Sequence, residues 1–408
     1  MRYKNLILFT SSFPYGTGEE FLETEILYLS KAFSKVIIYT SSSKGEVRNV
    51  PDNVFVKTIS FNNEFSVKKV FINNFFTLMN ILYYEIILSK KRIYFLRNIV
   101  FFINEIFWKL NHVNQIYKEI KSWVGPETLF YTYWFDNWAS YLSIIKIKYF
   151  CDINYITRIH GFDYEPSRRN NMFIPFRCFE MHQVKAIYSV SAYGVRIIKN
   201  EYPFFKKISI SRLGVNEKGV NPFKSGETFE LVSCSSIIPL KRIHLIVEIL
   251  EKISFPINWV HFGDGIEMSN IQEKIKKLPS NITVKLKGSQ SNNYVISYYH
   301  NNPIDLFINV SKFEGVPVSI MEAMSFGIPC IGCDVGGVSE IVNNETGFLF
   351  KKDFHPNEIS QCIELYYRKS EQEKIVFRNT VKLFWEKNYN AEKNYIDFIK
   401  TMAPNQIV

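Results

Sequence analysis

Two glutamates eight positions apart are the strongest candidates for chemistry in this sequence. Glu314 follows a short apolar run typical of a buried strand, and Glu322 lies where Pro317 favours the start of a helix. The first amides of that helix, at Val318 and Ser319, would have no acceptor within it and would carry the positive end of its dipole. An anion would bind there, and each carboxylate would bind hydroxyl groups. The pattern predicts a diphosphate held between two sets of sugar hydroxyls.

Other strand ends in the second half supply candidate partners for this site. Lys241 and Arg242 follow the first apolar run of that half, where their charges would neutralise a departing phosphate. Gly315 makes the tight turn beside the first glutamate, and Gly263-Asp264-Gly265 repeats a strand, turn and helix layout. The third glycine of a dinucleotide fingerprint is missing at Met268, so that reading is set aside.

The first half offers a glycine loop and a histidine. Gly16-Thr17-Gly18 lies between the first apolar run and a helix, and its glycines allow a phosphate or sugar to approach the backbone closely. His160 stands directly past the end of a predicted strand, which favours a role at a reaction centre over a purely structural one.

No motif in the sequence supports an NTPase, a zinc protease, a serine hydrolase or a nucleic-acid-binding protein. The chain has no Walker phosphate loop, no H-E-x-x-H and no G-x-S-x-G. Cys330-Ile-Gly-Cys333 is a lone C-x-x-C and is read as structural, so we expect no metal and no other cofactor. A formal charge of +10 favours polyanionic surroundings. The basic residues are dispersed and form no nucleic-acid module, so no nucleic-acid partner is expected.

Short apolar runs alternate with helical patterns along most of the chain, which is typical of parallel sheets. The sequence therefore predicts an α/β protein with two Rossmann-like, doubly wound domains facing a cleft. We expect domains at 1–213 and 229–385, a Gly- and Pro-containing linker at 214–228, and a C-terminal helix within 386–408 that crosses back. The expected strands lie at 6–10, 36–40, 54–59, 128–133, 155–159, 186–190, 208–212, 230–235, 258–262, 284–286, 306–310, 330–333 and 348–350.

Residues 61–123 depart from this alternation, because they are helical, aromatic and basic. Basic helices with exposed aromatics bind anionic membrane surfaces, but such helices can equally cover the domain's own sheet. The most apolar stretch, 70–89, contains polar residues, and the N-terminus lacks the features of a signal peptide. We therefore expect a cytoplasmic protein without a membrane span, peripheral on the inner face of the membrane if the insertion binds lipid.

These residues carry a family resemblance. The sequence looks like a GT-B glycosyltransferase and resembles glycosyltransferase family 4, the retaining enzymes of bacterial exopolysaccharide and lipopolysaccharide biosynthesis. The resemblance is strongest over Phe229 to Phe350 and rests on four strings. They are the E-x7-E motif at Glu314 and Glu322, Leu306-Phe-Ile-Asn-Val-Ser311, Gly336-Gly337-Val-Ser-Glu340 and Gly347-Phe-Leu.

The resemblance implies a role for each site residue. Glu314 would contact the donor sugar, Glu322 the ribose and Lys241 the diphosphate, while the Val318 and Ser319 amides would bind the terminal phosphate. His160 and the Gly16 to Gly18 loop would approach the reaction centre from the acceptor side. The implied reaction is a metal-independent hexosyl transfer with retention. It runs from a nucleotide-diphosphate sugar to a saccharide or lipid-linked saccharide.

One position departs from the family pattern. The family usually has an arginine five residues before the lysine, and this chain has Ser236, although Arg242 could replace that charge. Two alternatives therefore stay open. One is a non-catalytic protein that binds nucleotide sugars or acts as a scaffold, and the other is a GT-B epimerase or phosphorylase.

Overall fold

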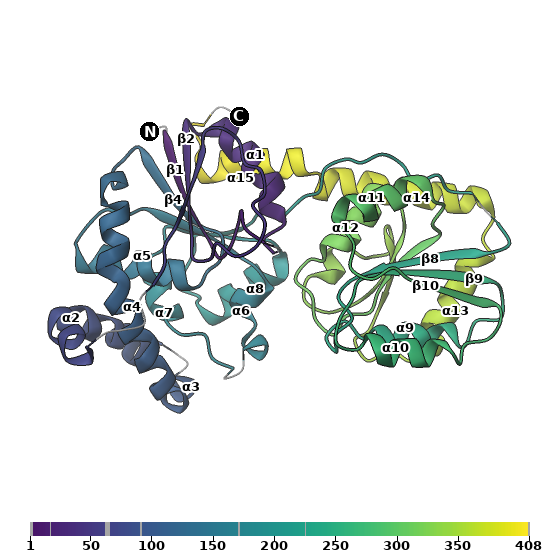
Figure 1. Cartoon of the computed structure of the whole chain (residues 1–408), viewed down its shortest axis with the longest axis horizontal. Helices are drawn as coiled ribbons and strands as arrows, with labels where there is room; N and C mark the ends of the chain where they lie inside the picture. Colours follow the sequence, from purple (N-terminus) through teal and green to yellow (C-terminus); the bar gives the residue numbers. More distant parts are fainter. Residues whose placement is uncertain are drawn as a thin grey trace. The chain divides into compact units, whose positions relative to one another are not determined.

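The computed structural model describes the chain except for residues 1–2, 17, 62–65, 90–91, 170–171, 225 and 407–408. The chain divides into two compact units. One comprises Met1–Arg212 with Tyr395–Val408, and the other comprises Leu213–Asn394. Each unit contains one parallel sheet with helices against it (Figure 1). The α/β class predicted from the alternation of apolar runs and helical patterns is confirmed.

The first unit has a sheet with the order β3-β2-β1-β4-β5-β6-β7 in the described residues, and every neighbouring pair is parallel. The chain leaves β1 toward β2 and β3, then returns to the other side of β1 as β4, so the order reverses between β1 and β4. The strands are β1 (Asn5–Thr10), β2 (Lys35–Thr40), β3 (Val54–Thr58), β4 (Thr128–Thr132), β5 (Tyr155–Ile159), β6 (Ala186–Ser189) and β7 (Ile208–Ile210).

Helices connect these strands. They are α1 (Phe21–Ala32), α2 (Val67–Leu82), the π-helical η1 (Tyr83–Leu88), α3 (Arg92–Arg97), α4 (Ile99–Ile120), the 3₁₀ turn η2 (Lys121–Trp123), α5 (Asn137–Lys148), α6 (Gly161–Tyr164), the 3₁₀ turn η3 (Pro166–Arg168), α7 (Arg177–Gln183) and α8 (Ala192–Glu201). The last helix of the chain, α15 (Ala391–Met402), lies next to α1 on the same unit (Figure 1).

The core of this unit has two layers because strand side chains alternate between the faces of the sheet. Ile7 and Phe9 belong to a cluster that includes residues of α2, α4 and α5. Leu6 and Leu8 point the other way and belong to a cluster with residues of α1 and α15. All four side chains are fully buried, as expected for a strand covered on both faces.

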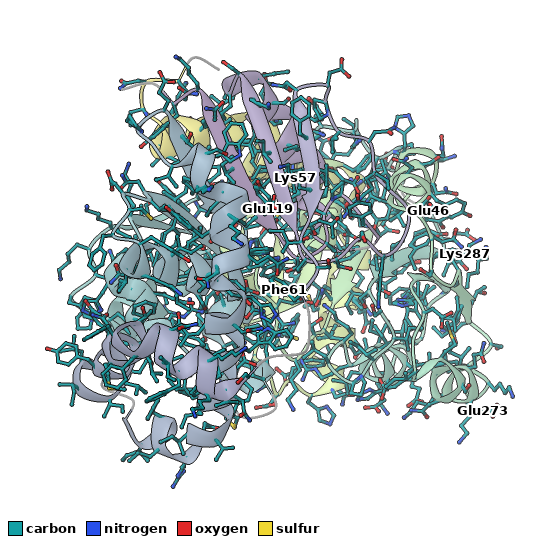
Figure 2. All side chains as sticks on the ribbon, turned by 60° about the vertical axis from the view of Figure 1, so that its left-hand side comes forward. Glu46, Lys57, Phe61, Glu119, Glu273 and Lys287 are labelled. Atoms are coloured by element: carbon teal, nitrogen blue, oxygen red, sulfur yellow. The ribbon has the colours of Figure 1, made fainter. Side chains whose placement is uncertain are left out.

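Within the region predicted as a helical insertion, 61–123, the described residues from Val67 onward are mostly helical. Its C-terminal end is anchored to the sheet, where Lys57 of β3 lies 3.7 Å from the Glu119 carboxylate of α4 (Figure 2). The Tyr39 hydroxyl donates to the Glu119 carbonyl at 3.0 Å, and Phe61 stacks on Tyr141 of α5. The insertion thus continues the helical layer over one face of the sheet.

The second unit repeats the doubly wound plan with the order β10-β9-β8-β11-β12-β13, again all parallel. Here the order reverses between β8 and β11. The strands are β8 (Phe229–Cys234), β9 (Ile257–Phe262), β10 (Ile282–Leu286), β11 (Leu306–Asn309), β12 (Cys330–Cys333) and β13 (Gly347–Phe350). The helices are α9 (Ile243–Leu250), α10 (Met268–Ile275), α11 (Asn292–Asn301), α12 (Val318–Ser325), the 3₁₀ turn η4 (Val338–Glu340), α13 (Pro356–Tyr367) and α14 (Glu371–Tyr389).

All thirteen predicted strands are present, with bounds that differ from the predicted ones by two residues or fewer. The agreement has a simple cause. Parallel strands that are buried on both faces appear in the sequence as short continuous apolar runs, and their length and flanking turn residues separate them from helices.

The segment predicted as a linker, 214–228, belongs to the second unit and is tied to it. Val215 exchanges backbone hydrogen bonds with the end of α14 and the start of α15. Asn221 is buried, and its side chain donates to the carbonyls of Tyr299 and Asn302 and accepts from Arg378. These hydrogen bonds hold the first half of the segment against the second unit.

The C-terminal boundaries also differ from the expected ones. Residues 386–394 lie in the second unit, and only residues from Tyr395 onward belong to the first. The reason is that α14 continues to Tyr389, whose side chain is fully buried and donates to the Glu340 carbonyl at 3.1 Å. Residues 395–408 return to the first unit through α15.

A buried ion pair in the first unit joins α1 to β5 and contacts the C-terminal helix α15. Arg158 of β5 and Glu25 of α1 are both fully buried and lie 3.3 Å apart. The Tyr131 hydroxyl donates to Glu25 at 3.0 Å and accepts from the Arg158 Nε at 2.9 Å. The guanidinium lies 4.2 Å from the ring centroid of Phe398 on α15. One cation therefore joins α1, two strands and the C-terminal helix.

Replacing Arg158 with Met should destabilise the first unit strongly, because Glu25 would stay buried without its cation. Breaking a buried pair in this way costs about 3–5 kcal/mol. We expect a drop in Tm of several degrees, measured by circular dichroism on the full chain. The exposed Arg196 on α8 supplies the control, since Arg196→Met should leave the Tm nearly unchanged. Equal melting of the two variants would contradict the role of the pair.

Candidate functional site

The strand reversal in the second unit places the candidate site. Ligands of doubly wound sheets bind beyond the carboxyl ends of the strands, where the strand order reverses. In this sheet that point lies between β8 and β11. Lys241 follows β8 and Glu314 follows β11, so the topology brings together two residues that lie 73 positions apart.

Lys241 and Glu314 form an ion pair at this edge. The lysine Nζ lies 2.5 Å from the glutamate Oε1, and the side chains are 21% and 12% exposed. Asn309, the last residue of β11, also points its amide toward Glu314 Oε1, at 3.3 Å. The carboxylate is therefore held in place by a cation and an amide. Sequence reasoning had not assigned a role to this asparagine.

Two consecutive glycines form the floor of the Glu314 loop. The Gly337 amide donates to the Gly315 carbonyl at 2.8 Å, and Gly336 adopts a φ of +58°. A Cβ at Gly336 would lie 1.8 Å from the Glu314 carbonyl oxygen, which no other residue can accommodate without moving the loop. The close backbone contact with Gly336 and Gly337 therefore fixes the position of the Glu314 loop.

Helix α12 begins where the sequence predicted an anion site. Pro317 is the residue before the helix, with extended ψ of 126°, and not its first turn as expected. Val318 and Ser319 are the first helical residues, and both are partly exposed. Amides in the first turn of a helix have no acceptor within the helix, so these two can bind a ligand. Glu322 lies one turn later and accepts a hydrogen bond from Asn292 of α11 at 2.5 Å. Sequence reasoning missed Asn292, because nothing local connects it to α12.

Arg242, predicted to contact the donor, is hydrogen-bonded to protein carbonyls. Its Nε donates to the Val310 carbonyl at 2.7 Å, and its Nη atoms donate to the carbonyls of Lys352 and Ser311 at 2.8 and 3.3 Å. The guanidinium thus braces the loops after β11 and β13. It is bound to protein carbonyls where the sequence predicted a phosphate, and Ser236 is exposed at the position where the family pattern has an arginine.

Gly263 and Asp264 lie at the end of β9, against the loop that follows β8. The Asp264 carbonyl accepts from the Ile237 amide at 2.8 Å, and its carboxylate accepts from the Gly265 amide at 2.6 Å. A Cβ on Gly263, whose φ is +144°, would lie 1.8 Å from the Ser235 carbonyl oxygen. These glycines are required by close contact between two loops of the protein.

The predicted glycine loop of the first unit is organised by Glu19, a residue to which sequence reasoning gave no role. Its carboxylate accepts hydrogen bonds from the amides of Ser11, Ser12 and Phe13 at 2.7 to 2.9 Å. It also accepts from the Trp134 indole at 2.7 Å. Gly16 and Gly18 both have positive φ, at 63° and 107°, and Thr17 lies outside the described residues. The loop is therefore fixed to the strand reversal between β1 and β4.

His160 stands at the end of β5, as predicted. Its ring packs on those of Tyr133 and Trp134, with centroids 4.7 and 4.5 Å away, and its amide donates to Asp163 at 2.8 Å. The Nε2 atom is screened from solvent and has no hydrogen-bond partner among the described residues. Burial, and to a smaller degree the Arg158 cation, lower the pKa of His160 from 6.5 to about 3. The ring is therefore neutral at physiological pH.

Trp134 brings the two predicted features of the first unit together. It hydrogen-bonds Glu19 of the glycine loop and packs on His160. No local sequence pattern points to this residue, because its partners follow β1 and β5, while Trp134 itself follows β4.

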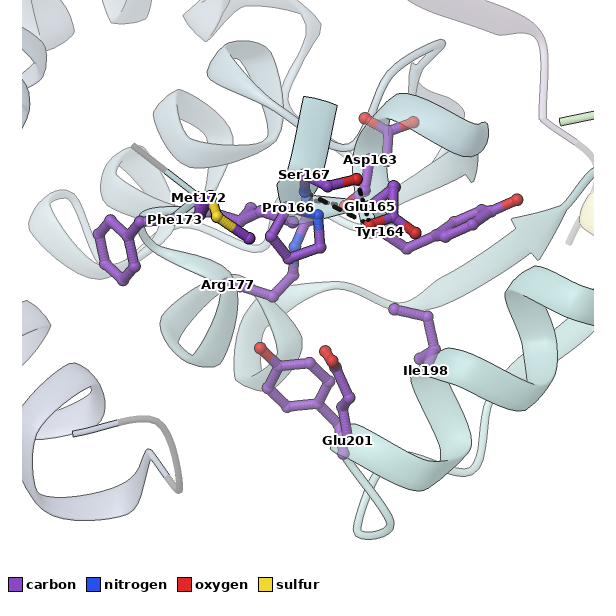
Figure 3. A pocket seen from close by; sticks show the side chains of 12 residues that line it. Asp163, Tyr164, Glu165, Pro166, Ser167, Met172, Phe173, Arg177, Ile198 and Glu201 are labelled. Atoms are coloured by element: carbon purple, nitrogen blue, oxygen red, sulfur yellow. Dashed lines mark hydrogen bonds between the residues drawn. The ribbon is translucent and has the colours of Figure 1, made fainter. Parts of the chain in front are cut away.

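A cavity of about 260 Å³ opens beside the short helix that follows His160 (Figure 3). Its wall combines the carboxylates of Glu165 and Glu201 with apolar side chains such as Ile198. The Ser167 hydroxyl donates to Glu165 at 2.7 Å, which orients that carboxylate at the cavity (Figure 3). Hydroxyl-rich molecules suit such a mixed lining, because carboxylates accept their hydrogen bonds and apolar groups cover the carbon faces.

Gly336→Ala should disturb the Glu314 loop, because the added methyl group would overlap its carbonyl oxygen. We expect at least a tenfold weaker binding of whatever ligand the site takes, with a normal fold by circular dichroism. Gly226→Ala is the matched control, since a Cβ at Gly226 meets no atom closer than 4.0 Å. Indistinguishable ligand binding by the two variants would remove the loop from the site.

His160 should make the stability of the chain pH-dependent. The folded state binds the imidazole proton with a pKa of about 3 and the unfolded state with a pKa near 6.5. The stabilisation is therefore complete above pH 6.5 and is lost as the pH falls toward 3. The Tm of wild type, relative to His160→Gln, should decrease from pH 7.5 to pH 4.5. A constant difference between the two proteins would show that the ring titrates freely.

Comparison with known proteins agrees with this geometry. Residues 217–382, which contain the Lys241 and Glu314 pair, match the protein family described as glycosyl transferases group 1. The chain is 28% identical, over 151 residues, to a UDP-N-acetylglucosamine--peptide N-acetylglucosaminyltransferase GtfA subunit of Streptococcus agalactiae. That match covers 34% of this chain and 28% of the relative.

A second relative is the Escherichia coli UDP-Gal:alpha-D-GlcNAc-diphosphoundecaprenol alpha-1,3-galactosyltransferase, at 24% identity over 220 residues. The match covers 47% of this chain and 55% of the relative. The chain thus spans less than two thirds of the length of either relative. Among solved structures, the lipopolysaccharide outer core galactosyltransferase WaaB superposes with a TM-score of 0.68 at 13% identity. The superposition covers 98% of this chain and 99% of the WaaB chain, which establishes the shared fold. The chain therefore has the GT-B fold, and its residues 217–382 match the group 1 glycosyl transferases.

Proposed function

We propose that this protein is a glycosyltransferase that moves a hexose, with retention, from a nucleotide-diphosphate sugar to an acceptor hydroxyl. The observation that carries the proposal is the Lys241 and Glu314 pair at the strand reversal of the group 1 domain. Helix α12, with its first amides at Val318 and Ser319, starts from the same loop. A cation, a carboxylate and a helix N-terminus on neighbouring loops suit a diphosphate joined to a sugar.

The site would act mainly by stabilising the leaving group. Negative charge develops on the departing nucleoside diphosphate as its bond to the sugar breaks. Lys241 and the positive end of α12 would interact with that charge. Glu314 would accept hydrogen bonds from donor sugar hydroxyls and Glu322 from the ribose. We assign no phosphate contact to Arg242, because its donors are engaged by protein carbonyls.

The proposed reaction breaks the bond between the anomeric carbon and the phosphate oxygen, and forms the new glycosidic bond on the same face. The proton of the acceptor hydroxyl passes to the departing phosphate oxygen, so no protein base is obligatory. His160, whose ring is neutral at physiological pH, would orient the acceptor or the donor sugar. The reaction as written needs no metal, and we expect EDTA to leave the rate unchanged.

The names of the relatives guide the choice of substrates to test. Both relatives are named for uridine diphosphate sugars, and one is named for an acceptor linked to diphosphoundecaprenol. We therefore propose UDP-hexoses or UDP-N-acetylhexosamines as donors. As acceptors we propose saccharides or lipid-linked saccharides of cell-surface polysaccharide synthesis. The reaction would take place in the cytoplasm, whose reducing conditions suit six unpaired cysteines.

The acceptor saccharide would bind to the first unit at the cavity beside His160. Glu165 and Glu201 offer acceptors for its hydroxyls, and the apolar side chains would cover a sugar ring. Glu201 lies at the end of α8, outside the loops that hold His160. A change there would therefore alter the KM for the acceptor more than the binding of the donor.

A second candidate, a protein that binds nucleotide sugars without transferring them, is favoured by Ser236. This exposed serine leaves Lys241 as the cation that we assign to the diphosphate. If wild type binds donors without turnover, Ser236→Arg should restore transfer. An epimerase or phosphorylase would instead release products from the nucleotide sugar without a saccharide acceptor.

The donor site can be tested with a panel of nucleotide sugars in thermal-shift and transfer assays. A true donor at about 100-fold excess over its Kd should stabilise wild type by roughly 2.7 kcal/mol. Lys241→Ala and Glu322→Gln should lose most of this shift and at least 100-fold in kcat/KM. The exposed Lys252, just after α9, provides the control, and Lys252→Ala should behave as wild type.

Two results would overturn the proposal. One is the absence of a thermal shift with every nucleotide sugar, and the other is unchanged kcat/KM in both site variants. Retention is read independently from the anomeric proton coupling of the product by NMR. Inversion would reject that part of the mechanism while keeping the transferase.

A further inference from the structure

The exposed apolar side chains of this protein concentrate on the helical insertion of the first unit. Of the 30 large hydrophobic side chains that are exposed in the described part of the chain, 15 lie between residues 67 and 103. They are Val67, Phe71, Ile72, Phe75, Phe76, Met79, Tyr83, Ile87, Leu88, Ile93, Leu96, Ile99, Val100, Phe101 and Ile103, which we call the apolar face. Such a concentration marks an interaction surface.

Helix α2 is apolar on both of its sides. Val70, Leu78 and Ile81 are buried against the unit's own core. The opposite side carries Phe71 and Phe76, exposed by 41% and 87%. A helix on the surface of a soluble protein normally presents polar residues outward, so this second apolar side calls for a nonpolar environment.

The outward aromatics contact one another along α2. The ring centroids of Phe71 and Phe75 are 5.6 Å apart, and those of Phe75 and Phe76 are 5.7 Å apart, both edge to face. They form a ridge whose outer side is exposed. Covering the domain's own sheet, one of the two roles predicted for the insertion, therefore explains its inner side and leaves the apolar face unexplained.

The apolar face ends partway along α4. Ile99, Val100 and Ile103 are exposed near the start of this helix. Two turns and more further on, the exposed residues are polar, at 114–115 and 118–119. A boundary of this kind across one helix is typical of an element that is partly immersed in a lipid interface.

The charges around the apolar face are positive. Lys68, Lys69 and Arg97 are exposed among its residues. Glu85 is the only acidic residue in the sequence from 66 to 104, and it is buried, with its carboxylate accepting from the Phe179 amide at 2.8 Å. A nonpolar surface whose exposed charged side chains, among the described residues from 66 to 104, are all cations complements an anionic lipid bilayer.

The insertion is suited to lie on the bilayer rather than cross it. Val67–Leu88 is the one described helical segment that is long and apolar enough to span a membrane. However, Leu78, Ile81 and Glu85 hold its inner side to the folded unit. Crossing the bilayer would require the segment to leave that core, whereas lying in the interface requires no rearrangement.

We propose that the apolar face docks the protein peripherally on an anionic membrane, with α2, α3 and the start of α4 in the interface. This inference rests on the first unit alone and does not depend on the proposed function. The positive rim favours anionic lipid over a second copy of this chain, because two such rims would repel each other.

Sedimentation with sucrose-loaded vesicles tests the docking directly. The full chain should bind vesicles of phosphatidylcholine with 30 mol% phosphatidylglycerol at 0.1 M NaCl, and pure phosphatidylcholine more weakly. Phe76→Ser with Val100→Ser should reduce binding to both at least tenfold. The matched control is Ile266→Ser with Leu365→Ser in the second unit, where the side chains are 85% and 69% exposed, and it should bind as wild type.

The charge contribution is separated by a second pair of variants. Lys68→Ala with Lys69→Ala should weaken binding to the anionic vesicles about fivefold per charge, and change binding to neutral vesicles little. Lys118→Ala with Lys121→Ala, at the polar end of α4, removes as many charges and should have a small effect. All of these side chains are exposed, so the variants should fold normally.

Three results would overturn the proposal. They are no binding of wild type to anionic vesicles, equal binding by the apolar-face variant and its control, and a dimer in light scattering that the apolar-face variant dissociates without changing vesicle binding. The last result would assign the face to a second copy of the chain.

Discussion

The parallel direction of the strands is the constraint on which the candidate site depends. Parallel strands bring all their carboxyl ends to one edge, and reversal of the strand order opens a crevice there. In the second unit the reversal lies between β8 and β11, so the loops that carry Lys241 and Glu314 must meet. No local interaction could produce this pairing, because the two residues are 73 positions apart. The same constraint in the first unit gathers the loops after β1, β4 and β5 around Trp134.

Close contact between backbones then sets the precision of the site. Gly336 lies under the Glu314 carbonyl, and Gly263 lies under the Ser235 carbonyl, each where a Cβ would overlap an oxygen. Arg242 adds three donor bonds to carbonyls of neighbouring loops. These contacts hold the loop with Glu314 in one arrangement before any ligand binds, which is what electrostatic stabilisation of a leaving group requires.

The first unit combines a rigid interior with an unusual surface. The buried Arg158 and Glu25 pair fixes both ends of the unit, and burial keeps His160 neutral beside it. Among the described residues of the insertion, by contrast, fifteen large apolar side chains remain in contact with solvent. A core that is already well formed cannot account for them, so their environment must come from outside the chain. A lipid-linked acceptor and a membrane-docked first unit would be chemically consistent with each other.

Local sequence patterns were enough to predict the architecture and part of the candidate site. Thirteen apolar runs predicted thirteen strands, because residues buried on both faces of a sheet must be apolar. Glu314, Glu322 and the start of α12 were visible because a turn, a proline and a helix are local signals. Tertiary structure decided the rest. It assigned Arg242 to protein carbonyls, supplied Asn292 as a partner for Glu322, and placed 214–228 within the second unit. Those outcomes depend on which strands are neighbours, and that is a property of the folded chain.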